Sequence, residues 1–216
     1  MMMEDDGGVT EAERVYAKFS SLVARKSSSI TLSNNDLTAA LNTSVHNNVY
    51  LDIDKTSGKW ACEFTNLAAF TGSRVSSFGF GTLNGSDGSF QLFTKFGGFQ
   101  FGVGYQPFDG SRNVNIGSPV VTTNYWRTIS TINTVHIVIF DFDNKQLLCP
   151  NPANTALISS SIGSITANLF AGLSMYGTAT STTLNSGQTA FTAGNEALIA
   201  AYETANGVTI NRGLWA

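Results

Sequence analysis

The chain has 216 residues, a formal net charge of -3 and 42% hydrophobic residues, and this length favours one large domain over two small ones. Only 12% of the residues are charged, and residues 146–211 contain no Lys or Arg, so the sequence offers no basic stripe for a nucleic-acid backbone. No apolar run predicts a membrane span, and the opening MMMEDDGG lacks the basic and apolar regions of a secretion signal. We therefore expect a protein that is made and kept in a cytoplasm-like compartment.

The N-terminal residues have the pattern of a capped amphipathic helix. Thr10 and Glu13 have the spacing of a capping box. The apolar residues that follow would share one helical face: Val15, Phe19, Leu22 and Val23. We expect residues 1–29 to form an arm with this helix and a Ser-rich linker. Two roles stay open, because the apolar stripe could dock on another molecule or pack on the domain that follows.

From residue 30 the sequence changes to short apolar runs separated by Gly, Asn, Asp and Ser, a pattern typical of a β-sandwich or barrel. The strongest run covers residues 134–148. Alternate residues from His136 to Phe142 would face one side of a strand, and Val135 to Ile139 would face the other. This predicts a central strand that is buried on both faces, most simply between two packed sheets, and a hairpin that turns at residues 143–145.

The C-terminal residues 193–216 predict an extension of this domain. Asn195 can cap a short helix whose apolar residues are Leu198, Ile199 and Tyr202. Trp215, near the end of the chain, is expected to tie the terminus down or to contact a neighbouring subunit.

Five groups of residues, in chain order, are similar to sequence motifs of SPRY domains. They are GKWACEF (58–64), SSFGFGTL (76–83), VGYQPFDGSRNVN (103–115), VHIVIFDFDNKQL (135–147), and the pair FAGLSMYG and LNSGQTAF (170–177 and 184–191). The resemblance implies an all-β fold over residues 30–192, namely a bent, two-sheet antiparallel jelly-roll sandwich of the concanavalin-like kind. One departure from the family pattern is Lys145, which stands where Gly is common.

Residues with catalytic or redox potential are few and scattered. His136 lies mid-strand among apolar neighbours and is expected to be a hydrogen-bonded core histidine, whereas His46 is expected in an exposed loop. Cys62 and Cys149 lack C-x-x-C spacing, which favours two reduced core thiols over one bridge. We therefore expect a protein that is not an enzyme and has no cofactor.

Two pairs of acidic residues have the spacing that places both carboxylates on one strand face. They are Asp52 with Asp54, and Asp141 with Asp143. Such pairs can bind Ca²⁺, but more often they end strands and form Asx turns. We expect turns and no metal site.

Recognition by loops is the remaining kind of function. The resemblance implies a shallow binding surface formed by loops at one end of the sheets, typically for protein segments, and related jelly rolls bind glycans there. The aromatic and charged candidates for this surface are Tyr105, Phe108, Asp109, Arg112, Tyr125, Trp126 and Arg127. For Phe108 and Trp126 an equal alternative is that they close the ends of the sandwich.

Two functions follow from these observations. The first is a bacteriophage virion protein that decorates the capsid or belongs to the tail. Its partners would be other virion proteins or further copies of itself, with a host-surface glycan or protein as an additional ligand. The second is a soluble recognition module that binds peptides or, like a lectin, glycans. Low charge and abundant Ser, Thr, Asn and Gly favour the first.

Overall fold

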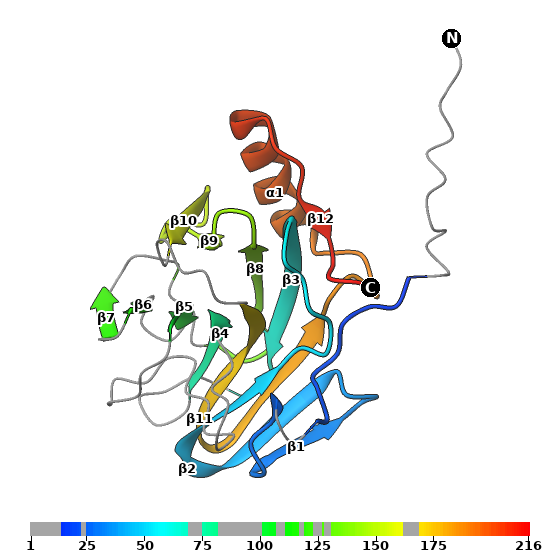
Figure 1. The fold of residues 1–216 in the computed structure, drawn as a ribbon, viewed down its shortest axis with the longest axis vertical. Coiled ribbons are helices and arrows are strands. Elements are labelled where there is room, and N and C mark those ends of the chain that lie inside the picture. Colours follow the sequence, from blue (N-terminus) through cyan, green and yellow to red (C-terminus); the bar gives the residue numbers. More distant parts are fainter. Residues whose placement is uncertain are drawn as a thin grey trace.

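The computed structural model describes residues 14–22, 25–68, 75–81, 101–106, 111–116, 119–122, 127, 131–161 and 169–216. In these parts the chain forms twelve strands and one helix (Figure 1). In chain order they are β1 Ile30–Ser33, β2 Thr38–Tyr50, β3 Lys59–Asn66, β4 Val75–Gly81, β5 Phe101–Gln106, β6 Ser111–Ile116, β7 Pro119–Thr122, β8 Val135–Asp141, β9 Gln146–Pro150, β10 Leu157–Ser161, β11 Phe170–Asn185, α1 Ala193–Asn206 and β12 Asn211–Arg212.

The strands form one hydrogen-bonded sheet with the order β10-β9-β8-β3-β11-β4-β5-β6-β7, and β2 and β1 are added along the other edge of β11. Neighbouring strands are antiparallel, except that the short β12 runs parallel to β3. This confirms the predicted all-β, mostly antiparallel architecture.

The long strand β11 divides the sheet into two layers. Its first half pairs with β4, and its last residues, from Thr182 to Asn185, pair with β3 on the same edge. Between these halves the register with β2 shifts on both sides of Gly177, and such irregularities allow a strand to bend. The β4 layer and the β3 layer therefore fold over each other and enclose the main core.

Aromatic side chains from the two layers meet in this core. Phe64 of β3 stacks on Phe78 of β4 with ring centroids 4.4 Å apart. Phe140 of β8 is fully buried in the same core, together with Leu173 and Met175 of β11. Burial of a Phe or Leu side chain contributes about 1.5–3 kcal/mol, so these contacts are the main source of stability for the sandwich.

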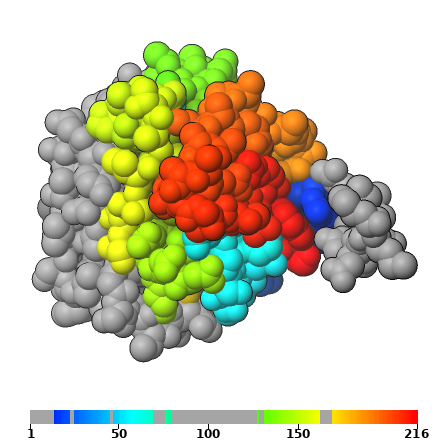
Figure 2. All heavy atoms as spheres, turned by 90° about the horizontal axis from the view of Figure 1, so that it is seen from above, coloured from blue at the N-terminus to red at the C-terminus, as the bar shows by residue number. Residues whose placement is uncertain are grey.

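Strand β8 is buried on both faces, as the sequence predicts, but the two covers differ in kind. Val138 and Phe140 face the core between the layers, whereas Ile137 and Ile139 belong to a second apolar cluster with Leu198 and other residues of α1 and the C-terminal segment. The expectation that a second sheet covers this face is wrong. A helix covers it: Leu198 and Ile199 of α1 pack in the same apolar cluster as Ile137 and Ile139, and α1 lies on the outside of the molecule (Figures 1 and 2).

Helix α1 begins three residues earlier than the predicted cap requires. Its N-cap is Thr192, and Asn195 lies within the first turn. The buried carboxylate of Glu63 on β3 accepts hydrogen bonds from the Thr192 amide (2.8 Å), the Thr192 hydroxyl (2.8 Å) and the Asn195 amide group (2.7 Å). A carboxylate at this position also interacts favourably with the positive end of the helix dipole. Glu63 therefore fixes the start of α1 on the sheet.

Residues 14–22, which we call the edge segment, are extended, so the predicted helix is wrong for these residues. Isolated bridges join Tyr16 to Trp215 and Phe19 to Leu51. Phe19 is 1% exposed, while Val15 and Leu22 are 65% and 61% exposed, which is incompatible with one shared apolar face. The docking helix built from Val15, Phe19, Leu22 and Val23 is therefore absent over the edge segment, and Val23 itself lies outside the described residues.

The hydrogen bonds of the edge segment explain why it is extended. Its backbone amides donate to carbonyl groups of three other parts of the chain: Ala17 to Leu214, Phe19 to Asp36, and Ser20 to Tyr50. In a helix these amides would bond within the segment instead. Of the two open alternatives, the structure therefore shows that the segment packs on the domain that follows. It does so as an extended part of the β-structure and not as a helix.

Candidate interaction surface

The loop residues predicted to bind a partner are described only in part. Register places the backbone of Tyr105 on β5 opposite that of Arg112 on β6. Arg127 is half-buried, its amide donates to the Pro150 carbonyl (2.8 Å), and its guanidinium donates to Asn154 Oδ1 (2.9 Å). The other four candidates lie outside the described residues: Phe108, Asp109, Tyr125 and Trp126. Their grouping into one surface remains a prediction.

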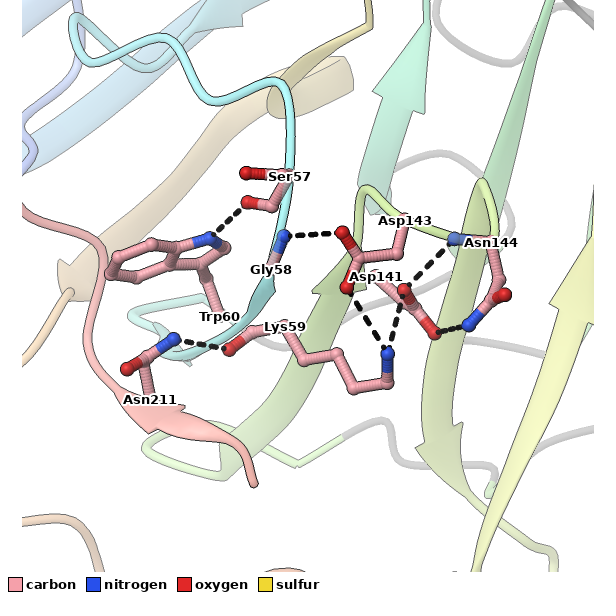
Figure 3. Close-up of polar contacts among 8 residues, drawn as sticks. All are labelled: Ser57, Gly58, Lys59, Trp60, Asp141, Asp143, Asn144 and Asn211. Atoms are coloured by element: carbon pink, nitrogen blue, oxygen red, sulfur yellow. Dashed lines mark hydrogen bonds and ion pairs between the residues drawn. The ribbon is translucent and has the colours of Figure 1, made fainter. Parts of the chain in front are cut away.

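The paired carboxylates hold turns and segments in place. Asp141 accepts from the Asn144 amide (3.1 Å) and side chain (2.8 Å), and Lys59 bridges Asp141 (3.2 Å) and Asp143 (3.4 Å) (Figure 3). Asp143 also accepts from the Gly58 amide (2.8 Å). This network joins the β8–β9 turn to the start of β3.

The second acidic pair fixes the loop after β2. Asp52 accepts from the Lys18 amide at 2.7 Å, and Asp54 forms two hydrogen bonds with the Arg25 guanidinium. Within the described ranges no three His, Cys, Asp or Glu side chains gather as a possible metal site.

An aromatic cluster that the sequence pattern did not reveal lies beside the network of Lys59, Asp141 and Asp143 (Figure 3). Trp60 at the start of β3 meets Trp215 edge to face with ring centroids 4.9 Å apart, and Tyr16 meets Trp215 at 6.2 Å. We call these three residues the tryptophan cluster. All three side chains are half-buried, so each ring keeps part of its surface in contact with solvent. The Trp60 indole donates to the Ser57 carbonyl (2.8 Å), which fixes the ring orientation (Figure 3).

Two cations lie over the rings of the tryptophan cluster. The Arg14 guanidinium is 4.5 Å from the Trp215 ring centroid, and the Lys55 ammonium is 4.2 Å from that of Trp60. Neither forms an ion pair with a described carboxylate, whereas Arg25, Lys59 and Arg212 all do. Burial lowers the pKa of Lys55, and no neighbouring described acid offsets this effect.

The cluster forms because three distant segments cross closely beneath it. The Ser186 hydroxyl donates to the Ala17 carbonyl (2.6 Å), and the Leu214 amide donates to the Ser186 carbonyl (2.9 Å). Gly213 has φ +112°, and a Cβ atom there would lie 2.2 Å from the Ser186 carbonyl oxygen. Only glycine permits this crossing, which brings Trp215 against Tyr16. Neither the spacing of these residues nor a local motif signals the contact.

One histidine and two cysteines in the described part of the chain are withdrawn from solvent. His136 is buried in the core with Nε2 3.1 Å from Asn66 Oδ1, and burial, helped by the charge of Arg127, lowers its pKa to about 3. This confirms the predicted hydrogen-bonded core histidine. Cys62 and Cys149 are buried free thiols whose pKa values are raised by burial. These side chains contribute to packing and are not placed to attack a substrate.

Comparisons with solved structures identify the fold. The SPRY domain of human HERC1 is similar with a TM-score of 0.57 and 12% sequence identity, over 80% of this chain and 99% of that domain. The TRIM65 PSpry domain is similar with a TM-score of 0.50 and 10% identity, over 79% of this chain and 92% of that one. No protein-family model and no curated protein matches the sequence. The chain therefore has a SPRY-like fold, as the sequence motifs suggested, and identity this low establishes the fold alone.

The single helix of the described residues is also too short and too polar to cross a membrane.

Proposed function

We propose that this chain is a protein-interaction module that binds its partner through the tryptophan cluster and the adjacent edge segment. The proposal depends on one observation: half-buried Trp, Tyr and Arg side chains gather at one place and keep part of their surface in solvent, and these residue types dominate the energy of protein contacts. Val15, which lies between Arg14 and Tyr16 in the chain, adds an exposed apolar side chain. The SPRY-like fold supports the same kind of function.

The cluster favours a protein partner over a glycan. A sugar ring stacks flat on an aromatic face, but Arg14 and Lys55 already lie over the faces of Trp215 and Trp60. A peptide can instead place carboxylate or carbonyl groups on these cations without displacing them.

A narrower form of the proposal places the module in a bacteriophage virion, on the capsid or the tail, where it contacts other virion proteins. Its support is compositional: only 12% of the residues are charged, and the sequence is rich in Ser, Thr, Asn and Gly. Because the edge segment belongs to the sandwich, it leaves no separate helix over residues 14–22 for docking. In this form of the proposal, contact with the particle is made by the tryptophan cluster.

Site-specific photo-crosslinking tests the proposal. A photoreactive residue replaces either Val15, which is 65% exposed and lies between Arg14 and Tyr16 in the chain, or Ile132, which is 55% exposed and precedes β8. In the native host extract or purified particle, we expect one defined protein to be captured from position 15 and not from position 132. Capture should fall when Arg14 and Lys55 are replaced by Ala. Equal capture from both positions, or no capture from position 15, would contradict the proposal.

A further inference from the structure

Charge is distributed unevenly between the first residues and the rest of the chain. Residues 1–13 contain five acidic residues and no Lys or Arg: Glu4, Asp5, Asp6, Glu11 and Glu13. Residues 14–216 contain all 12 basic residues and the remaining 10 acidic residues. The first 13 residues, which we call the acidic segment, thus carry a formal charge of -5, and the rest of the chain carries +2.

The acidic segment joins the chain at the tryptophan cluster. Its last residue, Glu13, directly precedes Arg14, whose guanidinium lies over Trp215, and Trp215 in turn contacts Trp60 beneath Lys55. Arg14 and Lys55 have no carboxylate partner among the described residues. A cation that is partly desolvated and unpaired gains more from an added carboxylate than one that is already in an ion pair.

We infer that the acidic segment of the chain binds the tryptophan cluster of the same molecule, with its carboxylates on Arg14 and Lys55. The inference rests on the proposed function, because the cluster is the contact surface that the segment would cover. Direct attachment at Arg14 gives the segment a high effective concentration at the cluster, so binding within one molecule prevails over binding between dilute molecules. A partner would then need an acidic segment of its own to displace it.

Zero-length carbodiimide coupling of the full-length chain, followed by peptide mapping, tests this directly. We expect an amide bond between Lys55 Nζ and a carboxylate of residues 4–13, formed within the monomer and reduced in about 1 M salt, where the Debye length is about 3 Å. The Lys59–Asp143 pair, 3.4 Å apart with a half-exposed Asp143 carboxylate, is the positive control for the reagent. Coupling of Lys59 without coupling of Lys55 to the acidic segment would overturn the inference, as would Lys55 coupling found only in covalent dimers.

A peptide-binding measurement provides the second test. In the full chain, the five acidic residues are replaced by their amides (E4Q, D5N, D6N, E11Q and E13Q), and tryptophan fluorescence follows the binding of a synthetic peptide of residues 1–13. We expect this chain to bind the peptide at least about tenfold more tightly than the unmodified chain, because the attached competitor is removed. Adding Lys55→Glu should weaken peptide binding again by about three- to tenfold, whereas Lys145→Glu, in the β8–β9 turn, should not. Equal peptide affinity of the amide-substituted and unmodified chains would count against the inference.

The two proposals fail in different ways. If Val15 captures a partner but Lys55 does not couple to residues 4–13, the interaction function stands and the inference about the acidic segment falls. If Lys55 couples within the monomer but Val15 captures nothing, the inference stands and the interaction function falls.

Discussion

Strand β8 and the edge segment both carry apolar residues at regular spacing, but only β8 has the structure that this spacing predicts. In β8 every residue from His136 to Asp141 is buried, and both strand edges are paired, to β3 and to β9. In the edge segment the buried residues are Ala17, Phe19 and Ser20, and backbone partners come from three distant segments. A long apolar run defines its own structure, whereas one large apolar residue fits a helix and a strand equally well.

The largest loss of stability is expected for a substitution of Phe140 in β8, because this side chain is fully buried in the main core. Phe140→Ala should lower the free energy of unfolding by about 3–5 kcal/mol, because it leaves a cavity between the two layers. Urea unfolding followed by circular dichroism measures this change. A loss below about 1 kcal/mol would show that β8 is not a core strand.

The corresponding test of the edge segment concerns Phe19. Phe19→Ala should cost about 3 kcal/mol, because the side chain is buried and belongs to the same core. Val15→Ala is the matched control and should change stability by less than about 0.5 kcal/mol, since Val15 is mostly exposed. Similar small effects of both substitutions in urea unfolding would mean that the segment is a detachable arm.

Helix α1, which covers the outer face of β8, is held in place by Glu63, whose carboxylate fixes the start of the helix. Glu63→Gln should cost about 2–3 kcal/mol, because it removes the charge from the oxygen that accepts from Thr192 and Asn195, and it places an NH2 group opposite the Asn185 amide donor that Glu63 Oε2 now accepts. Hydrogen exchange should accelerate in α1 more than in β11. Uniform acceleration in both elements would indicate that Glu63 does not act on the helix in particular.

Burial of His136 in β8 predicts a dependence of stability on pH. Its pKa is about 3 in the folded protein, below the ordinary value of 6.5, so between these values the unfolded chain binds more protons. The stabilisation is therefore complete above pH 6.5 and is lost as the pH falls toward 3. Between pH 7 and pH 5 it should decrease by about 2 kcal/mol. In urea titrations, His136→Gln should remove most of this loss, and an unchanged pH dependence would exclude a buried neutral histidine.

The smallest change in the free energy of unfolding is expected for a substitution of Lys145, in the turn after β8. Lys145 has φ +52°, a conformation that disfavours side chains with a Cβ atom. Lys145→Gly should stabilise the protein by about 0.5–1 kcal/mol, measured by the urea midpoint. Lys145→Ala is the control, because it removes the same side chain but keeps the strain. If Ala stabilises as much as Gly, the backbone conformation is not the cause.

Much of the fold could be predicted from local patterns. The β8–β9 hairpin, the core position of His136, and the helix carrying Leu198 and Ile199 all follow from residue spacing and turn residues. The tryptophan cluster could not be predicted, because Tyr16, Trp60 and Trp215 are far apart in the sequence and meet only where Gly213 crosses Ser186. Contacts of this kind depend on the path of the whole chain.

By itself, the sequence determined that this protein is a charge-poor β-sandwich with one doubly buried strand, because alternating apolar residues and turn residues act locally. Tertiary structure alone decided that the edge segment is extended, that a helix covers the outer face of β8, and that two cations lie over Trp60 and Trp215. The physical reason is that backbone amides and apolar faces take whichever partner the folded chain brings within reach, and a local pattern does not specify that partner.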